Sequence, residues 1–132
     1  MRQLEISNYI YILMMLFVFA CSTAFGQTFA TNETFKENIA KDITVVEFWA
    51  GWNVANEFKE LVKLKECNKY RVDIMNCSDL QMDYNITAIP TVVIFDNGVE
   101  KVRFGANIMF QLEADKKTIQ NSVDTIILNK FQ

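Results

Sequence analysis

Residues 43–58 read ITVVEFWAGWNVANEF. The first seven, 43–49, are mostly β-branched and aromatic, which predicts a strand covered on both of its faces. The turn Trp-Ala-Gly-Trp follows, and behind it come two asparagines in the spacing Asn-x-x-Asn, at positions 53 and 56. A strand that ends in such a turn raises the question of what chemistry the two amides perform.

Outward from this stretch, short helical and strand patterns alternate. A first helix is predicted to end at Ile39, and a second to run from about Val54 to Glu66, with Phe58, Leu61, Val62 and Lys65 on one face. A short helix is predicted over 78–84. A C-terminal amphipathic helix is predicted from the apolar positions Ile119, Val123, Ile126 and Ile127. Further strands are predicted at 69–75, 91–95 and 99–104, the last two joined into a hairpin by Asp96-Asn97-Gly98.

The order of elements is therefore strand, helix, strand, helix, strand, short helix, strand, strand and helix. Early strand–helix–strand units imply parallel pairing, and the late hairpin adds antiparallel strands. We expect a three-layer α/β/α fold, in which a mixed central sheet has helices on both faces.

Length and composition restrict the protein class. The chain has 132 residues, of which 51% are hydrophobic, and its formal net charge is −3. One domain with one packed core fits this length. No basic stripe is present, so a nucleic-acid partner is not expected.

The N-terminal residues have the pattern of an export signal. An apolar stretch from Tyr9 to Cys21 follows Arg2, and the small-x-small triplet 24–26 offers a cleavage site before Gln27. We expect residues 1–26 to be a signal peptide and 27–132 the domain. Two alternatives stay open: acylation of Cys21 as in a lipoprotein, or retention of residues 9–26 as a membrane anchor.

Two motifs carry a resemblance to a known family. The sequence VVEFWAGW, at 45–52, resembles the strand and turn that lead into the active site of the thioredoxin superfamily, which includes protein disulfide isomerases. The sequence YNITAIPTVVIFDNGVEKVRFGA, at 84–106, is similar to the segment that holds this family's cis-proline. The resemblance covers residues 29–131 and implies a thioredoxin-like fold, with Ile89–Pro90 as the candidate cis bond.

In this resemblance the family's Cys-x-x-Cys motif falls on Asn53-Val54-Ala55-Asn56, so both cysteines are absent. An amide has neither a nucleophilic thiolate nor a redox couple, and dithiol–disulfide exchange is therefore not expected. We expect Asn53 to cap the following helix. Glu47 stands where disulfide isomerases and some thioredoxins place a buried acid. It must be paired or protonated if buried, and we interpret it as structural.

Cys67 and Cys77 lie at opposite ends of a predicted strand, too far apart for a disulfide. Cys77 is the candidate lone thiol, because it follows a strand that ends at the same pole as Asn53 and Pro90. We expect a buried cysteine there, with a reactive thiol as the alternative. The chain contains no His, and no cysteine or carboxylate cluster has metal-ligand spacing. Neither a metal nor a cofactor is therefore expected.

Domains of this family without their cysteines generally present the groove around the former active site to other polypeptides. That groove is predicted to consist of Trp52, Asn53, Asn56, Thr87, Ile89, Pro90, Gly105 and Ala106. The sequence predicts a non-enzymatic module that binds a protein or extended peptide there by β-augmentation. The alternatives are a redox protein working through Cys77 and a membrane-anchored subunit of a larger complex. The expected location is the bacterial periplasm or envelope, with the endoplasmic reticulum lumen as the alternative.

Overall fold

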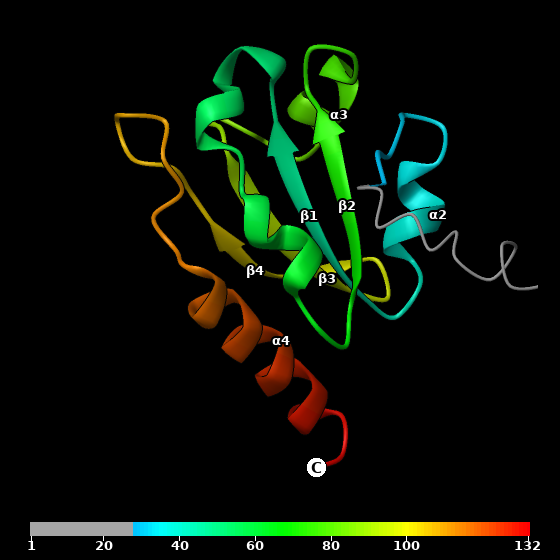
Figure 1. The fold of residues 1–132 in the computed structure, drawn as a ribbon. Helices are drawn as coiled ribbons and strands as arrows, with labels where there is room; N and C mark the ends of the chain where they lie inside the picture. The colour runs from blue at the N-terminus through cyan, green and yellow to red at the C-terminus, as the bar shows by residue number, and fades with distance from the viewer. Residues whose placement is uncertain (1–27) are drawn as a thin grey trace, which may run out of the picture.

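The computed structural model describes residues 28–132 (Figure 1). The segment 1–26, expected to be a signal peptide or an anchor, lies outside the described residues, and so does Cys21. Export, acylation and anchoring therefore stay predictions. Within residues 28–132, no helix has the length and apolar character needed to cross a membrane.

A four-stranded mixed sheet forms the centre of the domain, with the strands in the order β2-β1-β3-β4 (Figure 1). The strands are β1 (Ile43–Trp49), β2 (Asn68–Asp73), β3 (Thr91–Asp96) and β4 (Val99–Phe104). β1 pairs in parallel with β2, whereas β1 with β3 and β3 with β4 are antiparallel. The mixed sheet expected from the order of elements is confirmed.

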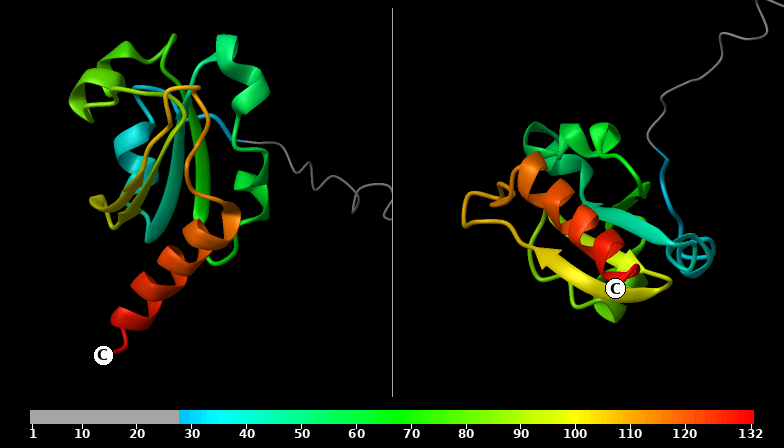
Figure 2. Two further views of the ribbon diagram at one scale, coloured as in Figure 1. Left: turned by 90° about the vertical axis from the view of Figure 1, so that its left-hand side faces the viewer. Right: turned by 90° about the horizontal axis from the view of Figure 1, so that it is seen from below.

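Helical segments cover both faces of the sheet (Figure 2). One face carries α2 (Phe35–Ile39) and α3 (Ser78–Asp83), and the other carries η1 (Gly51–Asn56), η2 (Lys59–Lys63) and α4 (Lys116–Asn129). Alternation along β1 divides the core, because Val46 and Phe48 pack toward α2 and α3 while Ile43 and Val45 pack toward η2 and α4. The expectation of helices on both faces is confirmed.

The first expected strand, which precedes the helix ending at Ile39, is reduced to a single bridge. Phe29 pairs in parallel with Arg71 at the free edge of β2, and the hydrogen bonds run from Ala30 N–H to the Arg71 carbonyl and from Arg71 N–H to the Thr28 carbonyl. The described chain then turns at Thr31 toward α2. The prediction of a full strand at this position is wrong.

The helix predicted from Val54 to Glu66 is also not present. Two 3₁₀ segments, η1 and η2, replace it, and extended backbone at Glu57 separates them. The Phe58 N–H donates to the carboxylate of Glu47 at 2.6 Å, so it makes no helical bond at this point. The apolar spacing agrees with this, because Phe58, Leu61 and Leu64 are buried at intervals of three, as three residues per turn require.

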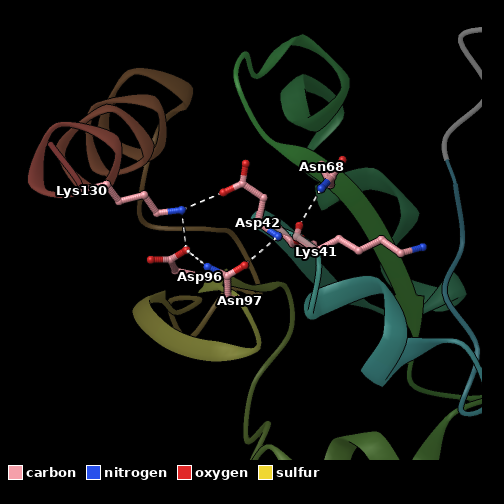
Figure 3. Close-up of polar contacts among 7 residues, drawn as sticks. Lys41, Asp42, Asn68, Asp96, Asn97 and Lys130 are labelled. Carbon is pink, nitrogen blue, oxygen red and sulfur yellow. Dashed lines mark hydrogen bonds and ion pairs between the residues drawn. The ribbon is translucent and has the colours of Figure 1, made fainter.

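The β3–β4 hairpin has the turn that its sequence predicts. Asn97 (φ 48°) and Gly98 (φ 84°) both have positive φ, as expected for the tight hairpin turns in which Asn-Gly is favoured. Beside this turn, at the pole opposite the C-terminal end of β1, Lys130 contacts Asp42 and Asp96 at 2.7 Å each (Figure 3). These contacts connect the end of α4 to the sheet.

Candidate functional site

One end of the sheet brings the predicted groove residues together. Phe48, near the end of β1, pairs with Thr91 at the start of β3, and Val92 pairs with Phe104 at the end of β4. The segment after β1, the turn before β3 and the loop after β4 therefore meet at one pole (Figure 1). This is the pole that the sequence predicts for the site.

Asn53 is buried at this pole, where its side chain links η1 to the loop after β4 and does not cap a helix. Its side chain is 6% exposed. Its Oδ1 accepts a hydrogen bond from Asn56 Nδ2 at 2.9 Å, and its Nδ2 donates to the Phe110 carbonyl at 3.0 Å. The N-cap of η1 is Ala50, and no side chain caps this segment. The prediction that Asn53 caps a helix is wrong, because both ends of its amide are occupied by other partners.

The loop 105–115 between β4 and α4 has a defined shape. The Asn107 side-chain oxygen accepts hydrogen bonds from the backbone N–H groups of Met109 (2.8 Å) and Gln111 (3.1 Å). The Asn107 N–H donates to the Gln111 carbonyl at 2.9 Å, and the adjacent pair Ala106 and Leu112 forms a bridge. These bonds close the loop tip and turn its apolar side chains outward.

An exposed apolar cluster results where this loop meets η1. The Phe110 ring lies edge-on to Trp52, with ring centroids 5.3 Å apart. Trp52 is 59% exposed and Ile108 is 97% exposed. We call the exposed group Trp52, Val54, Ile108, Met109 and Phe110 the apolar cluster. The sequence predicted Trp52 but missed 108–110, although Ile-Met-Phe after Gly105 follows neither the strand period nor the helix period.

The turn before β3 supplies the other predicted groove residues. The Ile89–Pro90 bond is cis, as the sequence suggested. Thr87 is exposed, and so is Gly105 in the loop after β4, but Pro90 is buried, so the expectation that Pro90 lines an open groove is wrong. The side chain of Ile89 is also only 4% exposed and belongs to the core. The expectation that this side chain lines an open groove is wrong, because it points into the layer beneath α3.

Glu47 is fully buried and paired. Its carboxylate contacts the Arg71 guanidinium at 2.6 and 2.7 Å and accepts the Phe58 N–H. Arg71 also contacts Glu57 at 3.1 Å and lies 5.4 Å from the centre of the Trp49 ring. Burial raises the pKa of Glu47 above its ordinary value, while the Phe58 amide and Arg71 oppose that shift. This pairing agrees with the structural interpretation of Glu47.

Neither described cysteine has the environment of an activated thiol. Cys67 and Cys77 are both free. Burial raises the pKa of Cys67 to about 11 and also raises that of Cys77, whose side chain is 5% exposed. Cys77 borders a cavity of about 330 Å³ between Phe29 and Trp49, and its Sγ lies 3.9 Å from the Ala30 carbonyl oxygen. The expectation that Cys77 is buried is confirmed.

An acidic cleft lies beside the apolar cluster. It has a volume of about 440 Å³ and runs between η1 and η2 on one side and the end of the loop 105–115 on the other. Four carboxylates line it, together with Asn56 and Gln111. These acids are Glu57, Glu60, Glu113 and Asp115. Across residues 28–132, no three His, Cys, Asp or Glu side chains form a group that could hold a metal ion.

The fold and this pole define a protein class. A mixed sheet covered on both faces, with a turn after β1 and a cis-proline before β3 at the same end, is the architecture of thioredoxin-like domains. The chain belongs to the thioredoxin family, since its sequence matches the family model described as Thioredoxin over residues 27–124.

Individual relatives agree with this assignment. The chain is 36% identical over 70 residues to a thioredoxin of Mycoplasma genitalium, an alignment that covers 48% of this chain and 69% of that relative. It is 30% identical over 82 residues to thioredoxin C-2 of Corynebacterium nephridii, covering 52% of this chain and 71% of that one.

Solved structures show the fold. A mutant thioredoxin from Halobacterium salinarum matches with a TM-score of 0.63 at 15% identity, covering 79% of this chain and 93% of its own. The thioredoxin of Malassezia sympodialis matches with a TM-score of 0.57 at 23% identity, covering 75% and 88%. The expected thioredoxin-like α/β fold is confirmed.

Proposed function

We propose that this thioredoxin-family domain is a non-catalytic module that binds an extended polypeptide at the pole carrying the apolar cluster. The observation that carries the proposal is the pair Asn53 and Asn56, which follow β1 where the family's resemblance places its two cysteines. A carboxamide has no accessible thiolate and no disulfide form, so this pair cannot exchange disulfides.

The contacts of Asn53 support a structural role for this pair. The Asn53 side chain is buried, and its amide is occupied by Asn56 and by the Phe110 carbonyl. A partner cannot reach this amide unless the loop 105–115 moves. Recognition is therefore assigned to the surface around Asn53.

That surface has the character of a peptide-binding site. Aromatic residues and Met are enriched at protein interfaces, and here Trp52, Met109 and Phe110 are exposed together. Thr87 lies exposed in the turn that leads into the cis bond. An extended chain can bury apolar side chains on this cluster and add main-chain hydrogen bonds along the turn.

Direct binding of labelled extended peptides, followed by fluorescence anisotropy, tests the proposal. Trp52→Ser should weaken binding, because a solvent-exposed ring of the cluster is removed without opening the core. The matched control is Leu128→Ser, which removes a side chain of similar exposure (63%) from the last turn of α4. Unchanged affinity in Trp52→Ser would contradict the proposal, provided that both variants keep the parent circular dichroism spectrum.

Insulin reduction tests the missing redox chemistry. The parent protein should be inactive, and the double variant Asn53→Cys/Asn56→Cys should form an internal disulfide and gain measurable activity. Activity of the parent protein would overturn the non-catalytic assignment.

A redox protein working through Cys77 is the second candidate, and it is favoured by relatives that carry the name thioredoxin. Burial of Cys77 and its raised pKa oppose this candidate, because the thiolate is the attacking species. Insulin reduction that is lost in Cys77→Ser would establish it.

A further inference from the structure

We infer that the polypeptide bound at this pole carries basic side chains next to apolar ones, so that it places Lys or Arg in the acidic cleft while its apolar residues cover the apolar cluster. The inference rests on the proposed function and specifies the chemistry of the partner. The acidic cleft and the apolar cluster lie next to each other at the same pole, and the cleft carries only negative charge.

The charge of the acidic cleft is of one sign. Four carboxylates border it, and none of the described Lys and Arg residues does. Lys116 and Lys117 follow Asp115 in the sequence, but neither lines the cleft. A surface with this balance attracts cationic groups and disfavours anionic ones.

Two of these acids have no ionic or hydrogen-bonding partner for their side chains among the described residues. Glu57 contacts Arg71, and Asp115 accepts hydrogen bonds from the backbone and side chain of Thr118. The side chains of Glu60 and Glu113 are exposed and make no such contact within residues 28–132. They are the charges that remain for a partner to neutralise.

The cleft adjoins the apolar cluster. Asn56, which lines the cleft, donates to Asn53, and Gln111, which also lines it, follows Phe110 directly. A strand advances about 3.3 Å per residue and turns alternate side chains to the same face. An extended segment that covers Trp52 and Phe110 therefore reaches the cleft within a few residues.

This arrangement separates the two kinds of contact. The apolar cluster provides area to be buried, and Glu60 and Glu113 provide the selection by charge. A partner with the same apolar residues but acidic flanks meets like charges in the cleft, which costs affinity.

Two labelled probe peptides test the inference. They share their Leu and Phe positions, and the residues between are Lys in one peptide and Glu in the other. The parent protein should bind the Lys peptide about tenfold more tightly than the Glu peptide at low ionic strength, as two exposed ion pairs would provide, and high salt should reduce the difference. The readout is the ratio of the two dissociation constants.

Charge reversal in the cleft provides the decisive variant. Glu60→Lys/Glu113→Lys should abolish or invert the preference for the Lys peptide. The matched control Glu37→Lys/Asp124→Lys changes the net charge equally at exposed positions on α2 and α4, and it should keep most of the preference. A preference that survives in the cleft variant overturns the inference.

The failures of the two proposals are distinguishable. Equal binding of both peptides, weakened in Trp52→Ser, would retain the peptide-binding function and reject the basic partner. Absence of binding by either peptide would reject both.

Discussion

Arg71 is 2% exposed, and its guanidinium links the buried Glu47 carboxylate to the segment between η1 and η2. Its guanidinium contacts Glu47 and Glu57 and donates to the Phe58 carbonyl at 3.3 Å. The Glu47 carboxylate in turn fixes the backbone at Phe58. The sequence indicated that a buried Glu47 needs a partner. It did not identify Arg71 as that partner, because Arg71 lies on a different strand, β2.

Removing the cation should be strongly destabilising. Arg71→Met leaves the Glu47 carboxylate buried without its counter-charge, and we expect a loss of roughly 3–5 kcal/mol in the free energy of unfolding, measured by urea denaturation. The additional change Glu47→Leu should recover much of that loss. A double variant no more stable than Arg71→Met would contradict this account.

The stability of Arg71→Met should also depend on pH in a defined direction. Burial already raises the pKa of Glu47, and loss of the guanidinium removes an opposing influence. When the pKa of a carboxyl group is higher in the folded protein than in the unfolded chain, protonation of that group favours folding. This contribution is fully present below the unfolded pKa and is lost as the pH rises through the folded pKa. Arg71→Met should therefore lose more stability at neutral pH than at pH about 4.

The two described thiols should be inert in the native protein. Cys77 is buried, and burial raises the pKa of both Cys77 and Cys67, so little thiolate forms near neutral pH. We expect iodoacetamide to leave both unlabelled in native protein and to label both in urea, as read by peptide mass spectrometry. Rapid labelling of Cys77 in native protein would restore the reactive-thiol alternative.

At the scale of elements, the segment after β1 shows how a local contact changes a helix. The sequence predicted one α-helix with Val62 and Lys65 on its inner face, but both are exposed while Leu61 and Leu64 are buried. An α-helix and a 3₁₀ helix differ by only about 0.6 residue per turn. The pattern alone therefore could not distinguish them over such a short segment.

Two truncations distinguish these arrangements. Leu64→Ala should cost about 2–5 kcal/mol, because a leucine that is 2% exposed leaves a cavity against α4 and the sheet. Val62→Ala, at a position 39% exposed, should change stability by less than about 0.5 kcal/mol. Thermal or urea unfolding measures both, and similar losses would favour the α-helical arrangement.

At the scale of the whole molecule, the two poles of the sheet differ in what they hold. One pole carries the apolar cluster and the acidic cleft, and the opposite pole is tied by ion pairs and hydrogen bonds. There Lys130 bridges Asp42 and Asp96, while the Asp42 N–H donates to the Asn97 side chain at 3.2 Å (Figure 3). Segments far apart in the sequence are joined at this end.

Removal of this bridge should have a small and pH-dependent effect. Lys130 lowers the pKa of Asp42, and a lowered carboxyl pKa contributes stability that is lost as the pH falls through the folded value. Lys130→Met should therefore melt slightly below the parent protein at neutral pH, and the difference should shrink as the pH falls below the lowered pKa of Asp42, and also in high salt. A difference that persists in acid would mean that packing of the Lys130 stem, and not its charge, is responsible.

The sequence by itself determined the four strands of the sheet, though not the reduction of the first expected strand to a bridge, together with the hairpin turn, the cis bond at Ile89–Pro90 and the family. These features depend on local periodicity and on motifs that lie close together in the chain. The strand 43–49 of the stretch ITVVEFWAGWNVANEF was predicted correctly, and so was the pole at which it ends. Residues 51 and 52, expected in a turn, instead begin η1. Tertiary structure alone decided the long-range contact of Asn53. Asn53 reaches a carbonyl 57 positions away at Phe110. Such a contact depends on how a distant loop packs against η1, and no local pattern encodes it.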